Sequence, residues 1–137
     1  MSSHIEIEGI RAKITNSKLG QGGQGLAQKA VLVSDPGIPL VVKSQPQAKK
    51  NHVRAKMLTA YNLPSLSPYL AGPIAMTTRN GQVLHLAPFA GGKDVETDRP
   101  RTFPELIEIC HHLSCQWCVL EEQGLAHGDI APSNVIV

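Results

Sequence analysis

The stretch HGDIAPSNVIV, residues 127–137, decides how the rest of this 137-residue sequence is interpreted. It places a carboxylic acid, Asp129, five residues before a carboxamide, Asn134. The segment before it has the apolar spacing of a long helix, and the last three residues, Val-Ile-Val, are β-branched and typical of a strand. We therefore expect both polar side chains in one loop between a helix and a short strand.

The helix before this loop is predicted over about residues 103–123, with Gly124 at its end. Its apolar residues follow the spacing i, i+3, i+4, i+7, i+11 and i+14, which is typical of a helix that buries one face. They are Leu106, Ile109, Cys110, Leu113, Trp117 and Leu120.

The first 90 residues consist of short β-prone runs separated by turn residues, which indicates an antiparallel sheet. Asn80-Gly81 is a strong signal for a tight hairpin turn between two of these runs. The five expected strands are residues 11–19, 28–33 and 40–43, and the two halves of a hairpin over residues 74–89.

One helix is predicted to be inserted among these strands, over about residues 46–62. Pro46 suits its first turn, where the missing N–H group is tolerated. The apolar residues that recur at helical spacing are Val53, Met57, Ala60 and Tyr61.

The composition changes at Gly91-Gly92, which we take as the hinge between two parts of the chain. The expected fold is α+β. Residues 1–90 form a five-stranded antiparallel sheet with one inserted helix, and residues 91–137 form a connector, the long helix and the loop that follows it.

The stretch GQGGQG, residues 20–25, has the glycine spacing G-x-G-x-x-G, which alone is a weak sign of function. A dinucleotide-binding turn opens a helix, whereas a β-prone run follows Gly25. A phosphate loop of the Walker type needs Lys and then Ser or Thr, and Leu26-Ala27 stands there instead. Two interpretations stay open: a β-turn whose backbone N–H groups approach phosphate oxygens, or a flexible hairpin without a ligand.

Lys43 favours the first interpretation. It lies in LVVKS, on the next strand but one, where its ammonium group can reach phosphates under the glycine turn. Taken by itself, however, it is equally well explained as a strand lysine on a solvent-facing surface.

Together, the glycine turn, the strand lysine and HGDIAPSN resemble the protein kinase-like superfamily, in the same order and on the same kinds of element. Asp129 and Asn134 match the D-x-x-x-x-N part of its catalytic loop. The resemblance extends from about residue 11 to the end of the chain. It implies a kinase-like N-terminal lobe and catalytic loop, and an ATP-dependent phosphotransferase of the serine/threonine protein kinase type.

The resemblance also implies roles for the matching residues. Lys43 would hold the α and β phosphates of ATP, Asp129 would accept the proton of the attacking hydroxyl, and Asn134 would hold Mg2+. His127 would support the loop. The stretch LAPFAGG, residues 86–92, resembles the hinge whose backbone meets the adenine edge. The implied cofactor-binding residues are Gly20, Gln21, Gly22, Gly23, Gly25, Lys43, Leu86 and Pro88.

Several positions depart from the family pattern. The family pairs the strand lysine with a glutamate on the inserted helix, yet residues 44–63 contain no Glu or Asp, and Arg54 occupies the aligned position. Gly128 replaces an arginine, Ala131 replaces a lysine, and Ala27 replaces the valine that roofs the adenine. The lost glutamate leaves a pseudokinase or nucleotide-binding scaffold open, and HGD leaves open a small-molecule kinase of the aminoglycoside or choline type.

A kinase also needs a D-F-G segment, which supplies a second magnesium ligand, and a helical lobe that binds the substrate. Neither is found in these 137 residues. We therefore expect an N-terminal portion of a larger kinase that is inactive in isolation. Its acceptor would be a protein or small-molecule hydroxyl, and its partner the rest of its own polypeptide.

Composition and sequence patterns indicate the cellular compartment in which the protein is expected. No apolar run reaches the roughly 18 residues that span a bilayer, and the N-terminus lacks the pattern of a signal peptide. The three cysteines fall within residues 110–118 and form no disulfide framework. We expect a cytoplasmic protein without a membrane partner.

Charge is unevenly distributed along the chain. Residues 36–93 carry no Asp or Glu but seven Lys or Arg, so the local field is positive. The run AKKNHVRAK, residues 48–56, suits a nucleic acid, although a basic helical run is more often a solvated face. Similarly, His111, Cys115 and Cys118 have a spacing able to present metal ligands, but small cysteines packed on a helix are the simpler interpretation.

Overall fold

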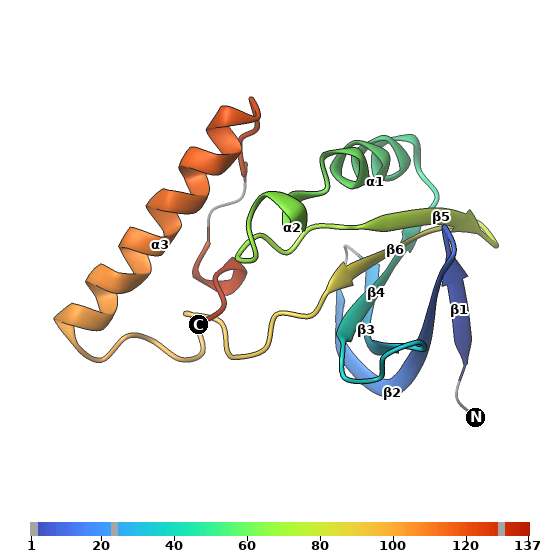
Figure 1. The fold of residues 1–137 in the computed structure, drawn as a ribbon, viewed down its shortest axis with the longest axis horizontal. Helices are drawn as coiled ribbons and strands as arrows, with labels where there is room; N and C mark the ends of the chain where they lie inside the picture. Colours follow the sequence, from blue (N-terminus) through green and yellow to red (C-terminus); the bar gives the residue numbers. More distant parts are fainter. Residues whose placement is uncertain (1–2, 23–24, 129–130) are drawn as a thin grey trace. The chain divides into compact units, whose positions relative to one another are not determined.

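The computed structural model describes residues 3–22, 25–128 and 131–137 (Figure 1). The chain divides into two compact units, Met1–Phe89 and Ala90–Val137. Each unit has its own secondary structure, and each is described by itself.

The first unit is built on an antiparallel sheet with the strand order β1-β2-β3-β4-β6-β5. The α+β class is as predicted, but the strand count is corrected from five to six in the described part of the chain. The additional strand is β1, which has only four residues and alternates buried Ile5 and Ile7 with exposed residues. The strands are β1 (His4–Ile7), β2 (Ile10–Gly22), β3 (Gly25–Leu32), β4 (Pro39–Pro46), β5 (Ala75–Arg79) and β6 (Gln82–Pro88).

One face of this sheet forms the hydrophobic core. The two edge strands, β1 and β5, contact each other, and the carboxylate of Glu8 accepts a hydrogen bond from the Met76 N–H at 3.3 Å. The sheet therefore curls around its core face. Burial of this apolar surface is the main stabilising contribution to the unit. The core residues are Ile5, Ile7, Ala12, Ala30, Leu40, Val42, Ala75 and Leu86.

The β5–β6 hairpin turns at Asn80 and Gly81, as predicted. Both residues have positive φ, 51° and 71°, which suits a two-residue turn that follows the twist of the strands. The prediction of this hairpin is confirmed. It could be made from the sequence because the turn depends on only two adjacent residues.

Helix α1 (Lys49–Tyr61) packs on β5 and β6, and the short α2 (Leu63–Leu66) follows it (Figure 1). Helix α1 begins at Lys49, later than predicted, because Pro46 is the last residue of β4. The predicted apolar face is also wrong: Val53 is 55% exposed and Met57 44% exposed, whereas Ala55 is buried. The residues of α1 that face the sheet are mostly polar or small.

In the second unit, α3 (Phe103–Glu122) begins with a capping box. The Thr102 hydroxyl accepts the Glu105 N–H at 3.3 Å, and the Glu105 carboxylate accepts the Thr102 N–H at 3.1 Å. Backbone N–H groups of Arg101 and Thr102 hold the pKa of Glu105 below its ordinary value. Two otherwise unpaired donors at the helix start are thereby satisfied.

The helix ends at a left-handed glycine. Gly124 has φ 70°, and the Leu125 N–H bonds back to the Leu120 carbonyl at 2.9 Å, as in a Schellman motif. Of the predicted apolar stripe only Leu120 is buried. No helix in the described ranges is long and apolar enough to cross a membrane.

After α3 the chain forms a short 3-10 helix, η1 (Pro132–Asn134), and then pairs with the start of the unit. Asp94 and Ile136 form an antiparallel bridge, and the Val95 N–H donates to the Val135 carbonyl at 2.9 Å. The residues after Asn134 therefore run as a short extended segment.

We predict that Gly25→Ala destabilises the first unit. Gly25 has φ 116°, which a residue with a Cβ rarely adopts, and a Cβ there would overlap the carbonyl oxygen of Ser44 in β4. The expected loss is about 1–3 kcal/mol in the free energy of unfolding, measured by urea denaturation.

Gly20→Ala is the matched control, because a Cβ at Gly20 meets nothing within 4 Å. Its free energy of unfolding should stay within about 0.5 kcal/mol of the wild type. Equal stability of the two variants would contradict the placement of Gly25 against β4.

Candidate functional site

Lys43 lies on the face of the sheet opposite the core. Successive side chains of a strand point to opposite faces, and its neighbour Val42 is buried in the core. The register places Ala27 of β3 and His85 of β6 directly beside Lys43 on the same face. We call this the Lys43 face.

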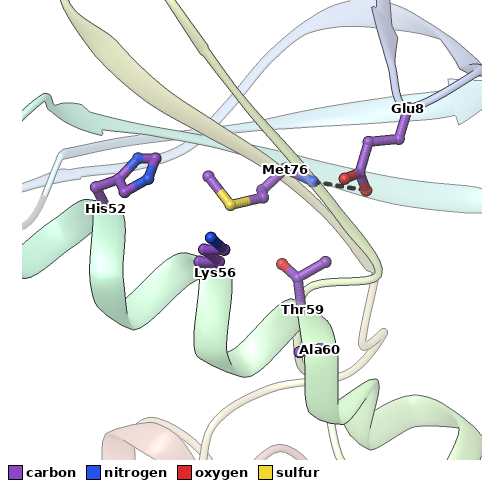
Figure 2. A pocket seen from close by; sticks show the side chains of 6 residues that line it. All are labelled: Glu8, His52, Lys56, Thr59, Ala60 and Met76. Carbon is purple, nitrogen blue, oxygen red and sulfur yellow. Dashed lines mark hydrogen bonds between the residues drawn. The ribbon is translucent and has the colours of Figure 1, made fainter.

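Helix α1 covers part of the Lys43 face. Met76 of β5 is the cross-strand neighbour of His85 and so lies on the same face. Met76, His52 and Thr59 line one pocket, so α1 packs against this side of the sheet (Figure 2). The strand lysine and the inserted helix are therefore on the same side.

A small apolar floor lies next to Lys43. One step along the strands, Val41 and Ala87 are paired on the same face and are only 8% and 6% exposed. With Ala27 they form a patch of small apolar residues, in which Val41 and Ala87 are already largely covered. Lys29, also on this face, has its ammonium group 4.7 Å from the centre of the Phe89 ring.

The glycine-rich hairpin borders this floor. The pairing of β2 with β3 continues as far as Gly22 and Gly25, and Gly20 is the partner of Ala27 on the Lys43 face. Gly23 lies outside the described residues. The side chain of Gln21 pairs with Leu26 on the core face, so at most its backbone belongs to this site.

The side chains of Leu86 and Pro88, the two predicted cofactor-binding residues of the hinge segment, lie on the core side of β6, and a role for their backbone stays a prediction. Leu86 is fully buried in the core, and its carbonyl accepts the Ile74 N–H at 2.8 Å. Pro88 pairs with Leu40 and lies on the core side as well. Ala87 between them lies on the Lys43 face, and the Phe89 ring that follows meets Lys29 of the same face.

The catalytic-loop residues belong to the second unit. Asp129 lies outside the described residues. Asn134 ends η1, and its N–H donates to the Ala131 carbonyl at 2.9 Å. The structure thus brings together Gly20, Gly22, Gly25 and Lys43 within the first unit and places Asn134 in the second.

The electrostatics of the Lys43 face are dominated by cations. Burial, and then the charges of Lys43 and Arg54, lower the pKa of His85 from 6.5 to about 4, so this imidazole is neutral at pH 7. Its Nδ1 atom is buried and has no hydrogen-bond partner among the described residues. Because residues 36–93 contain no carboxylate, no acid of the β4–β6 region balances these charges.

Two cavities flank the sheet. One of about 390 Å3 lies between α1 and β5 and is lined by Glu8, His52, Lys56, Thr59, Ala60 and Met76 (Figure 2). The other, of about 400 Å3, opens on the core face beside Val42 and Leu84. Neither contains Lys43.

The structure gives no support to a metal site on α3. No group of three or more His, Cys, Asp or Glu in the described ranges is placed to share a metal ion. Cys110, Cys115 and Cys118 are free and exposed, and the Cys115 Sγ lies 3.9 Å from the His111 Nε2.

Sequence reasoning missed Val41, His85 and Ala87. Alternation counted back from Lys43 identifies Val41, because residues two apart on a strand share a face. His85 and Ala87 needed the register between β4 and β6, which no local signal specifies.

Comparison with known proteins places this geometry in a known fold. No family model matches the sequence, and no curated protein matches it. Among solved structures, the chain is similar to a double mutant of the Mycobacterium tuberculosis PknI kinase domain, with a TM-score of 0.74 and 18% identity over 99% of this chain. It is also similar to Rad53 in complex with AMP-PNP, with a TM-score of 0.72 and 18% identity over 90% of this chain.

The fold is kinase-like. The chain spans 58% of that PknI chain and 34% of the Rad53 chain. A single mutant of the PknI domain gives a TM-score of 0.73, also at 18% identity. At this identity the similarity concerns the fold alone.

We predict that His85 makes stability depend on pH. Its pKa is lowered to about 4 in the folded protein. Between this value and 6.5 the unfolded chain binds a proton that the folded chain does not, so stability rises with pH and is lost as the pH falls through this window. Urea unfolding should show a larger loss of stability from about pH 7 to about pH 5 in the wild type than in His85→Gln. Identical losses would contradict the lowered pKa.

Proposed function

We propose that the protein binds ATP on the Lys43 face and that the complete protein transfers its γ-phosphoryl group to a hydroxyl, as serine/threonine protein kinases do. The observation that carries this proposal is the placement of Lys43 beside an apolar floor, at the border of the glycine hairpin, in a kinase-like fold. AMP-PNP is bound by Rad53, which shares this fold.

The floor suits the base of a nucleotide. Ala27, Val41 and Ala87 have short apolar side chains, against which an adenine ring can lie once the groups that cover Val41 and Ala87 move aside. Lys43 lies one row further along the strands, where its ammonium group can meet the phosphates. The backbone N–H groups of the glycine hairpin add donors without side chains that would block approach.

Asp129 and Asn134 supply the remaining chemistry in this proposal. The Asp129 carboxylate would accept the proton of the attacking hydroxyl. The Asn134 amide oxygen is a hard donor of the kind Mg2+ prefers, and Mg2+, when bound through it and the phosphates, would neutralise developing charge. We place the acceptor platform in the part of the kinase fold that this chain does not span, and the protein in the cytoplasm.

Two substitutions test this function. Lys43→Ala should weaken ATP binding by about tenfold or more, because a charge-assisted contact is lost, while Arg79→Ala, an exposed cation at the far end of β5, should leave it unchanged. Asp129→Asn should keep ATP binding and abolish transfer of the γ-phosphoryl group by the complete protein. Calorimetry measures the first effect and radiolabelled ATP the second. Full transfer activity in Asp129→Asn would overturn the assignment.

A second candidate is a nucleotide-binding scaffold without catalysis. Arg54 stands where the kinase pattern has a glutamate, so the ion pair that normally positions the lysine is missing. Magnesium-dependent phosphoryl transfer by the complete protein would exclude this candidate, and ATP binding without any transfer would favour it.

A further inference from the structure

Helix α1 presents two different flanks to the sheet. His52, Lys56 and Thr59 line the cavity against Met76 of β5, so this flank faces the outer edge of the sheet (Figure 2). Buried Ala55 lies in the middle of the face that packs on the sheet.

The opposite flank lies on the side of β6 and β4. At about 100° per residue, Asn51 and Arg54 project to the side of Ala55 away from Lys56. The Asn51 Nδ2 donates to the carbonyl of Pro46, the last residue of β4, at 2.8 Å. Arg54 therefore lies on the flank of α1 away from β5, on the side of β6 and β4, and its side chain is exposed.

The field at His85 agrees with this placement. The positive charges of both Lys43 and Arg54 lower its pKa, after the larger effect of burial. His85 is the direct neighbour of Lys43 on the Lys43 face. Both cations thus act on the same residue of β6, the strand beside β4.

Neither cation has a counter-charge among the residues that the structure describes. Lys43 and Arg54 make no ion pair with any residue in the described ranges. Residues 36–93 contain no carboxylate that could be brought to them by a side-chain movement. Two unbalanced like charges on one face repel each other, and an anion bound between them removes that repulsion.

We infer that Lys43 and Arg54 form a two-cation site for a polyphosphate, in which Arg54 is a second phosphate-binding residue where the kinase pattern has a glutamate. The statement that this polyphosphate belongs to a nucleotide rests on the proposed function. Lys43 contributes a point charge, and the planar guanidinium of Arg54 can donate two parallel hydrogen bonds to one phosphate. The bound phosphates, rather than a helix carboxylate, then hold Lys43 in position.

The test compares Arg54→Glu with Lys56→Glu in the full 137-residue chain. Both variants make the same charge change on α1, but on opposite flanks, and circular dichroism checks that each is folded. Calorimetry without Mg2+ measures affinity for inorganic tripolyphosphate, ATP and adenosine. Arg54→Glu should weaken tripolyphosphate and ATP binding by about tenfold or more and leave adenosine binding unchanged. Lys56→Glu should stay within about twofold of the wild type.

The opposite outcome is equally clear. A carboxylate at position 54 that restored an ion pair with Lys43 would leave ATP affinity equal or higher, and this result would overturn the two-cation site. If Arg54→Glu does not fold, Arg54→Gln removes the charge alone, and unchanged tripolyphosphate affinity in that variant would overturn the inference as well.

The ligand series separates the inference from the proposed function. Tripolyphosphate binding that depends on Arg54, with no affinity for adenosine and no gain for ATP, would support the site and contradict the nucleotide assignment. Adenosine and ATP binding that does not depend on Arg54 would support the proposed function and contradict the site. A wild type that binds none of the three ligands would overturn both.

Discussion

The placement of β4 between β3 and β6 is the constraint on which the rest of the first unit depends. Hydrogen bonds on both sides prevent this strand from rotating, so Val42 must enter the core and Lys43 must lie on the opposite face. The same register aligns Ala27 and His85 with Lys43. A shift of one residue would put the lysine into the core, where an unpaired charge is very costly.

Charge on the Lys43 face is linked to how α1 packs. The helix places polar side chains against the sheet, and His52 Nδ1, Thr59 Oγ1 and His85 Nδ1 are buried without partners among the described residues. Such an interface contributes less than an apolar one, because unsatisfied polar atoms lose their contacts with water. The helix is therefore held by a weak polar interface, and an anion that binds both Arg54 and Lys43 would strengthen the attachment.

Structural features that depend on a few neighbouring residues were predicted well from the sequence, whereas features that depend on long-range strand pairing were not. Asn80-Gly81 specified its hairpin because the required φ values belong to these two residues. Strand β1 was missed because four residues are too few to show a clear alternation. The apolar residues Val53 and Met57 led to a wrong prediction of the buried face of α1, because the position of the sheet decides which side of the helix is covered. The positions of His85 and Ala87 on the Lys43 face could not be predicted from the sequence, because the register between β4 and β6 assigns each residue to its face.

A binding measurement can show which face of the sheet meets a nucleotide. Methyl NMR of the full chain, titrated with AMP-PNP, distinguishes the faces because side chains of one strand report separately on each. Nucleotide binding on the Lys43 face would change the chemical shifts of the methyl groups of Ala27, Val41 and Ala87 and leave those of Val42, Leu84 and Leu86 nearly unchanged. Changes confined to the second group, around the cavity on the core face, would contradict it.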